Sequence, residues 1–331
     1  MGDAAESLLR VQDLAISYRR GGRELDVVNG VSFDVLPGEI FGLVGESGSG
    51  KSTVIRSLIQ LLPANATIGA GEIIFGGRSL LRLREREMQR IRGRDISMVF
   101  QDPLNSLNPV MTIGKQIGET LKGGDGHARS RRERVLDAMR LVHIPDPMRL
   151  YSAYPHELSG GLRQRVAIAI ALVASPRLLL ADEPTTALDV TIQDQILKLL
   201  IELSGRLGMG VILVTHDLGI VAQTCRRVAV LYAGRIVESG PAERIFARPA
   251  HPYTAGLLQS IPRGPASEGM LKGIGGTPPS LDSIPAGCPF HPRCAFAIAD
   301  CRGERPPLVA HEASHLTACI RHGEFADFAH G

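Results

Sequence analysis

The chain has 331 residues, 44% of them apolar and 21% charged, with a formal net charge of +3 at pH 7. This balance is typical of a globular protein with one large domain, or one domain and an appendage, and is not basic enough to indicate a nucleic-acid partner. No apolar run reaches the roughly 18–20 residues that span a bilayer. The opening "MGDAAESLLR" lacks a signal-peptide pattern, so we expect a cytosolic chain whose membrane role depends on partners.

The first part of the chain alternates strand patterns with one helix. "LLRVQDLAISY" alternates as a strand does, and "RRGGRELDVV" predicts a hairpin with its turn at Gly21–Gly22. The short apolar run "EIFGLVG" predicts a buried strand ending in glycine. "KSTVIRSLIQLL" has helical spacing at Val54, Leu58 and Leu61–Leu62, and "GAGEIIFGG" predicts a further strand.

The middle and the C-terminal parts of the chain differ in composition and in hydrophobic periodicity. Residues from about 112 to 158 are charged and helical in period, which indicates a helical insertion. "VAIAIALVA" is apolar on every side and predicts a buried helix. "RLLLADE", "GVILVTHD" and "RVAVLYAG" predict strands, with a helix between the first two, so we expect an α/β fold with a mostly parallel, helix-covered sheet. From about residue 249, Pro, Gly, His and Cys predict a separate C-terminal appendage.

Residues 45–52, "GESGSGKS", match the phosphate-loop pattern G-x-x-x-x-G-K-[ST] between a predicted strand and a predicted helix. Its glycines let the backbone wrap a β-phosphate with inward N–H groups. Lys51 adds a positive charge for the β- and γ-phosphates, and Ser52 offers its hydroxyl to Mg²⁺. The residues predicted to bind ATP here are Gly45, Glu46, Ser47, Gly48, Ser49, Gly50, Lys51, Ser52 and Thr53.

Polar side chains follow three of the predicted strands, where α/β sheets bind ligands. Asp182 ends "LLLAD" and is predicted to hold Mg²⁺ with Ser52, while Glu183 is a candidate base for an attacking water. His216 ends "VILVTH" and could hydrogen-bond a γ-phosphate. Gln101 ends "DISMVFQ" and could hold Mg²⁺ or the water. Each residue alone fits an ordinary turn or strand end, and the phosphate loop favours the catalytic role.

A second glycine loop, "LSGG" at residues 158–161, opens another predicted helix. Its N–H groups at the positive helix end suit an anion. Because the phosphate loop already provides one anion site, this loop is expected to serve another.

With these motifs in this order, the chain resembles the ATP-binding subunits of ABC transporters over roughly residues 8–260. "GESGSGKS" resembles their Walker A motif, "LLLADE" their Walker B motif and "LSGG" their signature motif. Gln101 resembles their Q-loop glutamine and His216 their switch histidine. Asp189, which ends "TALD", resembles their D-loop, and Tyr18 the aromatic residue that stacks on adenine.

The resemblance implies an architecture as well as an activity. The expected fold is a phosphate-loop NTPase with a RecA-like core, an antiparallel β subdomain and a helical subdomain at about residues 104–175. The ATP-binding cassette would span residues 8–258, followed by a C-terminal region at residues 259–331 that contains the cysteines.

In this family two cassettes dimerise head to tail, and the signature loop of one caps the ATP bound by the other. The residues implied to contact the partner's γ-phosphate are Ser159, Gly160, Gly161 and Leu162. Two positions depart from the commoner pattern, since Leu162 replaces a frequent Gln and Thr186 replaces a frequent Ser. The glycine amides, Ser159 and a hydroxyl at position 186 remain, so both departures are compatible with an active site.

A narrower resemblance, to the D-type ATPase of oligopeptide and dipeptide importers, rests on "QDPLNSLNPVMTIGKQIGE", "HPYTAGLLQSIP", "PPSL" and the cysteine tail. It implies two permeases, a second and paralogous ATPase, and a substrate-binding protein, with no nucleic acid. Residues 104–158 would contact the permeases' cytoplasmic coupling helices. The chain would then lie on the cytoplasmic face of the inner membrane. Nickel and other non-peptide solutes remain alternatives.

Four of the five cysteines, Cys288, Cys294, Cys301 and Cys319, lie in the C-terminal region, and the isolated Cys225 is expected to be inert. Four thiolates suffice for Zn²⁺ or an iron–sulfur cluster, and the wide spacing suits the cluster better. The resemblance of "GCPFHPRC" also implies a [4Fe–4S] cluster with a structural role, with Zn²⁺ and unligated cysteines as alternatives. His291, His311 and His315 are expected at the surface.

Two other classes compete with a transporter ATPase. A soluble ABC ATPase acting on ribosomes or DNA typically has two fused cassettes or a long coiled coil, and this chain has one phosphate loop and no sustained heptads. A small-molecule kinase would leave the signature loop and His216 without a role. The expected mechanism is therefore in-line attack of water on the γ-phosphate, with Glu183 as base.

Overall fold

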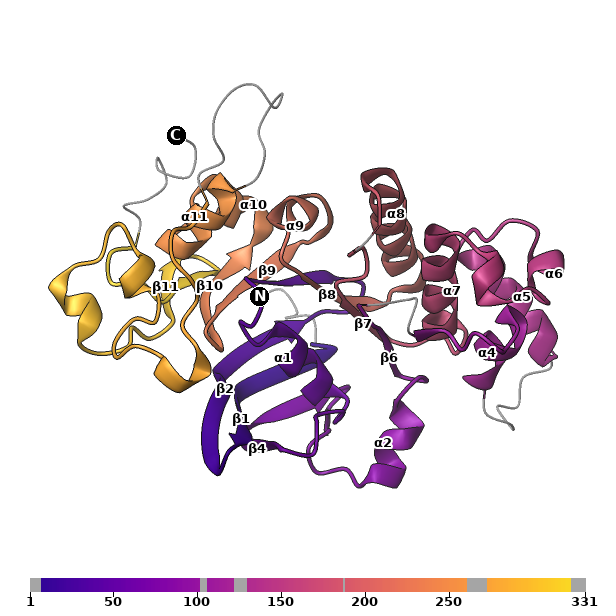
Figure 1. The fold of residues 1–331 in the computed structure, drawn as a ribbon, viewed down its shortest axis with the longest axis horizontal. Helices are drawn as coiled ribbons and strands as arrows, with labels where there is room; N and C mark the ends of the chain where they lie inside the picture. The colour runs from indigo at the N-terminus through magenta and orange to yellow at the C-terminus, as the bar shows by residue number, and fades with distance from the viewer. Residues whose placement is uncertain (1–6, 102–105, 122–129, 187, 261–272, 323–331) are drawn as a thin grey trace, which may run out of the picture. The chain divides into compact units, whose positions relative to one another are not determined.

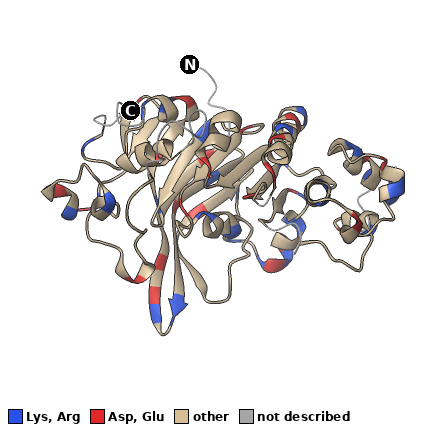
Figure 2. Cartoon of the chain, turned by 45° about the horizontal axis from the view of Figure 1, so that its top comes forward, with Lys and Arg blue, Asp and Glu red and all other residues tan. Residues whose placement is uncertain are grey.

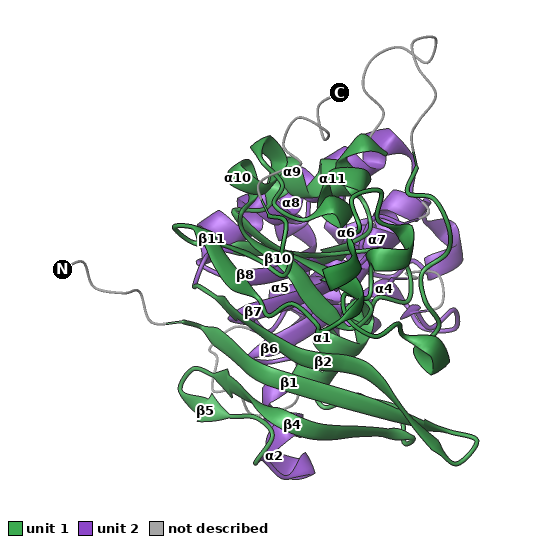
Figure 3. Ribbon diagram, turned by 90° about the vertical axis from the view of Figure 1, so that its left-hand side faces the viewer, with its two compact units in different colours: residues 1–36, 40–82, 214–331 green, residues 37–39, 83–213 purple. Residues whose placement is uncertain are grey.

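The computed structural model describes residues 7–101, 106–121, 130–186, 188–260 and 273–322 (Figure 1). The chain divides into two compact units (Figure 3). Unit 1 comprises residues 1–36, 40–82 and 214–331. Unit 2 comprises residues 37–39 and 83–213.

Unit 1 contains an antiparallel sheet in the order β2-β1-β4-β5. Its strands are β1 (Leu9–Arg20), β2 (Arg23–Val35), β4 (Ala66–Phe75) and β5 (Arg78–Ser79). The predicted hairpin is confirmed, because Arg20 pairs with Arg23 across Gly21 and Gly22. Both glycines have positive φ, 57° and 79°, which is the conformation of two-residue hairpin turns.

A second group of strands in unit 1 has the order β11-β12-β10-β9-β3. Its members are β3 (Ile40–Val44), β9 (Arg227–Tyr232), β10 (Arg235–Pro241), β11 (Val309–Glu312) and β12 (His315–Thr317). β3 pairs with β9 in parallel, and every residue of β3 is buried. The continuous apolar run predicted for β3 is therefore a strand covered on both faces, as parallel sheets require.

The helices of unit 1 are α1 (Lys51–Leu58), α9 (Leu218–Thr224), α10 (Ala242–Ala247) and α11 (Pro252–Gln259). The predicted first helix continued through Leu61–Leu62, and this extension is wrong. Gln60 adopts a left-handed φ of 50°, which ends the helical path, and Leu61 is exposed.

Unit 2 contains β6 (Ile96–Val99) and β7 (Leu178–Asp182), which pair in parallel, with β8 (Gly210–Thr215) next to β7 in the strand order. The last two residues of β8 belong to unit 1. Val99 pairs with Ala181, so the carboxyl ends of β6 and β7 are neighbours. The α/β prediction is confirmed.

The helices of unit 2 are α2 (Glu85–Ile91), α4 (Ile113–Glu119), α5 (Arg131–Leu141), α6 (Pro147–Leu150), α7 (Gly160–Leu172) and α8 (Val190–Leu207). α4, α5 and α7 pack on one another, which gives the predicted helical insertion its own core (Figure 1). Val166, Ile168 and Ala169 of α7 are buried, as the all-round apolar run predicts. Residues 104 and 105 and the predicted break "GGDGHAR" lie outside the described residues.

The C-terminal region shares the sheet of unit 1, since β12 pairs with β10 through Glu238 and Thr317. Glu238 is fully buried and accepts hydrogen bonds from the backbone N–H groups of Ala250 (2.7 Å) and His251 (3.1 Å). His315 Nε2 lies 2.7 Å from the same carboxylate. The prediction of a surface position for His315 is therefore wrong, because this buried carboxylate needs a polar partner and the imidazole provides one.

Charges of both signs are interspersed along the chain (Figure 2). On α8, Lys198 pairs with Asp194 at 2.7 Å and Arg206 with Glu202 at 2.7 Å, both at the i,i+4 spacing. This distribution agrees with the modest net charge of +3. Among the helices of the described residues, none combines the length and the apolarity needed to cross a bilayer.

Candidate functional site

The predicted phosphate loop, residues 45–52, joins β3 to α1 in unit 1. The Lys51 ammonium is 5% exposed and donates hydrogen bonds to the carbonyl oxygens of Gly45 (2.7 Å) and Glu46 (2.9 Å). The loop therefore curls around its own lysine. α1 begins without a side-chain cap and without an acidic residue in its first turn, so its first N–H groups suit an anion.

Two glycines of the loop are required by sterics. A Cβ at Gly45 would overlap the carbonyl oxygen of Leu231, and Gly50 has a φ of 104° with a Cβ position 3.0 Å from the carbonyl oxygen of Val27. The buried Ser49 Oγ has no hydrogen-bond partner among the described residues. A buried hydroxyl of this kind fits an oxygen of a bound phosphate.

Other predicted nucleotide residues of unit 1 lie near the loop or at the end of a strand. The Tyr18 hydroxyl, on β1, is 3.1 Å from Thr53 Oγ1 on α1. His216 is exposed directly after β8, and the adjacent Asp217 caps α9 by accepting from the Gly219 N–H at 2.7 Å.

The predicted hydrolytic residues of unit 2 meet at the carboxyl ends of β6 and β7. Gln101 Nε2 donates to Glu183 Oε2 at 3.1 Å, and the Thr186 hydroxyl donates to the same oxygen at 2.9 Å. Glu183 has a left-handed φ of 47°, which costs a non-glycine residue about 1–3 kcal/mol and is concentrated at functional sites. Asp182, the last residue of β7, is buried. The structure thus brings Gln101, Thr186 and Glu183 together.

The signature loop of unit 2 begins α7. The Ser159 hydroxyl caps this helix by accepting from the Leu162 N–H at 3.4 Å, and Ser159 and Gly160 are exposed. The helix begins at Gly160, within the "LSGG" motif. Gly161 is enclosed, because a Cβ there would lie 2.8 Å from Ile192 Cγ2 on α8.

The predicted D-loop residue Asp189 caps α8. Its carboxylate accepts from the Ile192 N–H at 2.9 Å. The next residue, Val190, is 81% exposed. Ala187, between Thr186 and Leu188, lies outside the described residues.

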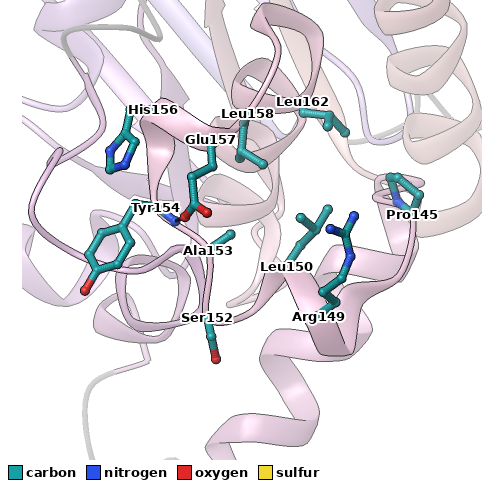
Figure 4. A pocket seen from close by; sticks show the side chains of 10 residues that line it. All are labelled: Pro145, Arg149, Leu150, Ser152, Ala153, Tyr154, His156, Glu157, Leu158 and Leu162. Carbon is teal, nitrogen blue, oxygen red and sulfur yellow. Dashed lines mark hydrogen bonds between the residues drawn. The ribbon is translucent and has the colours of Figure 1, made fainter.

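A cavity of about 610 Å³ lies in the helical part of unit 2 (Figure 4). Its apolar wall includes Leu150, Leu158 and Leu162, and Arg149 and Glu157 add one charge of each sign. Leu158 and Leu162 flank the signature glycines in sequence. The cavity is therefore continuous with the signature loop.

The four C-terminal cysteines carry free thiols. Burial, together with the charges of the other three thiols, raises the pKa of Cys319 to about 12, so the four lie in one region. Burial also raises the pKa of Cys288 and Cys294. Within the described residues, however, no group of three or more His, Cys, Asp and Glu side chains is arranged to hold a metal ion. The donor chemistry suits a metal, but this geometry does not support the predicted cluster.

Two residues that the sequence did not single out contact the phosphate loop. Arg293 forms a two-pronged ion pair with the Glu46 carboxylate, and the Tyr253 hydroxyl accepts from the Glu46 N–H at 2.8 Å. In the sequence, Tyr253 stands in "HPY" and Arg293 in "HPRC". Neither motif indicates a contact with Glu46, which lies more than two hundred residues earlier in the chain.

Comparison with known proteins gives two family matches and full-length relatives. The ABC transporter model matches residues 28–186, and the model for the C-terminal region of oligopeptide/dipeptide transporters matches residues 237–301. A probable peptide ABC transporter ATP-binding protein of Sinorhizobium fredii is 49% identical over 324 residues, which cover 97% of this chain and 96% of that protein. The dipeptide transport ATP-binding protein DppD of Bacillus subtilis is 47% identical over 326 residues, which cover 98% of this chain and 97% of that protein. The oligopeptide transport ATP-binding protein OppD of Salmonella typhimurium is 46% identical over 321 residues, which cover 96% and 94%.

Solved structures agree with these matches. A dimeric ATP-binding cassette in a post-hydrolysis state, bound to ADP and Pi, aligns with a TM-score of 0.62 and 29% identity over 71% of this chain and 98% of that one. The cbiO1 protein from Clostridium perfringens, part of an ABC transporter complex, aligns with a TM-score of 0.64 and 29% identity over 73% of this chain and 91% of that one. The chain therefore belongs to the ATP-binding proteins of the ABC transporter family, in the group with the oligopeptide/dipeptide transporter C-terminal region.

Proposed function

We propose that this chain is the ATP-hydrolysing subunit of an ABC importer that takes up di- or oligopeptides. The observation that carries the proposal is a phosphate loop curled around a buried Lys51, in a chain aligned almost end to end with peptide-transport ATP-binding proteins. Import of nickel or another non-peptide solute is the alternative within the group. A soluble ABC ATPase is the alternative outside it.

The phosphate loop would hold the β- and γ-phosphates of ATP. Lys51 would exchange its carbonyl partners for phosphate oxygens, and the buried Ser49 hydroxyl would gain a partner. Tyr18 would stack on adenine from β1, close to Thr53. The residues proposed to contact the nucleotide remain Tyr18, Gly45, Glu46, Ser47, Gly48, Ser49, Gly50, Lys51, Ser52 and Thr53.

The residues that could hold Mg²⁺ are Ser52, Gln101 and Asp182, whose hydroxyl, amide and carboxylate oxygens are ligands that this ion prefers. When bound, Mg²⁺ would neutralise charge on the phosphates. Glu183 would accept the proton of the attacking water. Its Oε2 is oriented by two donors, Gln101 and Thr186, which supports this role. His216 would hydrogen-bond the γ-phosphate.

The signature loop would act on ATP held by a second cassette. Its exposed Ser159 and Gly160 begin a helix of thirteen residues, and the helix N-terminus favours an anion. Val190, 81% exposed near Asp189, is an apolar side chain that a partner chain would cover. A paralogous ATPase is the proposed partner, with Leu162 and Asp189 in the same interface.

The cavity beside α6 would receive a cytoplasmic segment of a permease. An amphipathic helix fits its apolar wall and its two rim charges. Cysteine cross-linking tests this contact in the assembled complex. Ala153→Cys, in the cavity lining, should cross-link to a permease, whereas the exposed Ala64→Cys in unit 1 should not. Equal cross-linking from both positions would contradict the assignment.

For the tail we propose that Cys288, Cys294, Cys301 and Cys319 bind an iron–sulfur cluster, [4Fe–4S], or alternatively Zn²⁺. The support is four free thiols in one region of the fold. Iron, zinc and acid-labile sulfide would be measured after anaerobic purification of the full chain. Cys294→Ser should lose the metal, and Cys225→Ala, which changes the isolated cysteine, should retain it. Absence of both metals would exclude the proposal.

The experiment that tests the function begins with affinity purification from gently solubilised membranes. Two multi-spanning proteins and a second ATPase should co-purify, which would also place this chain at the inner face of the membrane. The complex, reconstituted in liposomes with its binding protein, should accumulate labelled peptides only with ATP and should leave nickel outside. Recovery with ribosomes or DNA-bound proteins would instead favour a soluble ABC ATPase.

A further inference from the structure

Glu46, the second residue of the phosphate loop, is contacted by Arg293 of the C-terminal region and by Tyr253 of α11. Arg293 Nη1 donates to Glu46 Oε2 at 2.6 Å, and Nη2 donates to Oε1 at 2.9 Å. The Glu46 N–H donates to the Tyr253 hydroxyl at 2.8 Å. A two-pronged guanidinium–carboxylate pair sets direction as well as distance.

The Arg293 side chain is itself fixed in place. It is 5% exposed, its Nε donates to the Gly275 carbonyl at 3.0 Å, and its Nη1 donates to the Tyr232 hydroxyl at 3.3 Å. Its guanidinium lies 5.8 Å from the ring centre of Tyr232 and 5.9 Å from that of Phe290. A guanidinium held by rings and carbonyls can hold Glu46 in one position.

The position of Glu46 also sets the shape of the loop. Its carbonyl oxygen accepts from the Lys51 ammonium at 2.9 Å, so the backbone of one residue links the C-terminal region to the phosphate-binding lysine. Tyr253 is fully buried, which keeps its hydroxyl in place. A shift of Glu46 would therefore move the groups that wrap the phosphates.

Charge gives a second reason for the contact. An ionised Glu46 within a loop that binds polyphosphate would repel the ligand, by an amount that depends on its distance and its exposure. The ion pair with Arg293 cancels this charge locally.

We propose that Arg293 is a positioning residue of the nucleotide site: it acts through Glu46, with Tyr253 as a second contact, to hold the phosphate loop ready for ATP. This inference rests on the proposed role of the phosphate loop. It makes α11 and the C-terminal region a functional part of the nucleotide site.

The test is a double-mutant cycle in the full chain, within the assembled complex. Arg293→Gln should raise KM for ATP about tenfold, with a much smaller change in kcat, because ground-state positioning of the loop is lost. In the Glu46→Gln background the same substitution should change KM less than about twofold, since its target charge is gone. Arg302→Lys, an exposed arginine of the same tail, is the control and should change neither value.

Arg293→Lys covers the case in which Arg293→Gln does not fold. Lysine keeps the positive charge but cannot form the two-pronged hydrogen bond to Glu46. KM for ATP should therefore rise severalfold, while the midpoint of thermal unfolding stays near that of the parent. An equal rise in KM in both Glu46 backgrounds, or no rise at all, would overturn the proposal. Lys51→Ala distinguishes failure of the proposed phosphate-loop role from failure of the Arg293 proposal. If Lys51→Ala abolishes ATP binding while the Arg293 variants bind ATP normally, only the positioning role of Arg293 is wrong.

Discussion

The phosphate loop of unit 1 and the signature loop of unit 2 both place serine and glycine at the start of a helix, but their surroundings differ. Lys51 is buried, and Glu46 is held by Arg293 and Tyr253. Ser159 and Gly160 are exposed, and the side chains nearest to the two glycines are Leu188, just before α8, and Ile192 of α8. The first loop is supported by contacts from its own chain. The second is exposed, as a loop completed by a second chain would be.

The largest effect is expected on turnover, from a substitution at Glu183, which lies outside both loops. Glu183→Gln removes the proposed base while keeping an acceptor for Gln101 and Thr186, so turnover should fall by about 10²–10⁴. ATP binding by the phosphate loop should persist, and the dimer should remain closed. Phosphate release and nucleotide binding would be measured together. Glu202→Gln, in a surface ion pair on α8, is the matched control. Ordinary turnover by Glu183→Gln would exclude Glu183 as the base.

Lys51→Ala tests the loop that is supported by its own chain. Loss of charged hydrogen bonds worth about 1.5–3 kcal/mol should weaken ATP binding by about ten- to a hundredfold. Equilibrium binding of a fluorescent ATP analogue would measure it. Lys198→Ala, on the surface of α8, should leave affinity unchanged. Equal affinities for the Lys51 variant and the parent would contradict the phosphate-loop role.

The two glycines of the signature loop separate folding from partner recognition. Gly161→Ala places a Cβ 2.8 Å from Ile192 Cγ2, so it should destabilise the fold by about 1–3 kcal/mol in urea unfolding. Gly160→Ala has room, with Leu188 Cδ2 at 3.8 Å, and should leave the unfolding free energy nearly unchanged. It should nevertheless weaken ATP-dependent dimerisation, measured by sedimentation. Normal dimerisation would show that Gly160 does not face the partner's nucleotide.

The last prediction concerns how the unfolding free energy depends on pH at His251, in the same unit as the phosphate loop. Burial lowers the pKa of His251, the cap of α11, from 6.5 to about 3, so its contribution to stability is complete above pH 6.5 and is lost as pH falls toward 3. The slope is about 1.4 kcal/mol per pH unit. The His251 cap accepts from the Tyr253 N–H through Nδ1 at 3.1 Å. His251→Asn offers an amide oxygen as acceptor in its place and removes the titration, so its urea-unfolding free energy should depend less on pH between 7 and 5. Identical slopes for both proteins would contradict this.

Two predictions made from local sequence patterns were wrong. The helical spacing of Leu61–Leu62 did not reveal that Gln60 turns left-handed. Nothing in the sequence around His315 indicated a buried carboxylate at Glu238. Local periodicity contains no information on such pairings.

By itself, the sequence determined the α/β class, the hairpin at Gly21–Gly22 and the glycine segments that lead into α1 and α7, because glycine conformation, helix starts and strand periodicity are local properties. Tertiary structure alone decided that Gln101 and Thr186 share an oxygen of Glu183, and that Arg293 holds Glu46 from 247 positions away. Those contacts depend on sheet register and on the packing of the C-terminal region. Register and packing bring together segments that are far apart along the chain, and the periodicity of the sequence does not indicate such pairings.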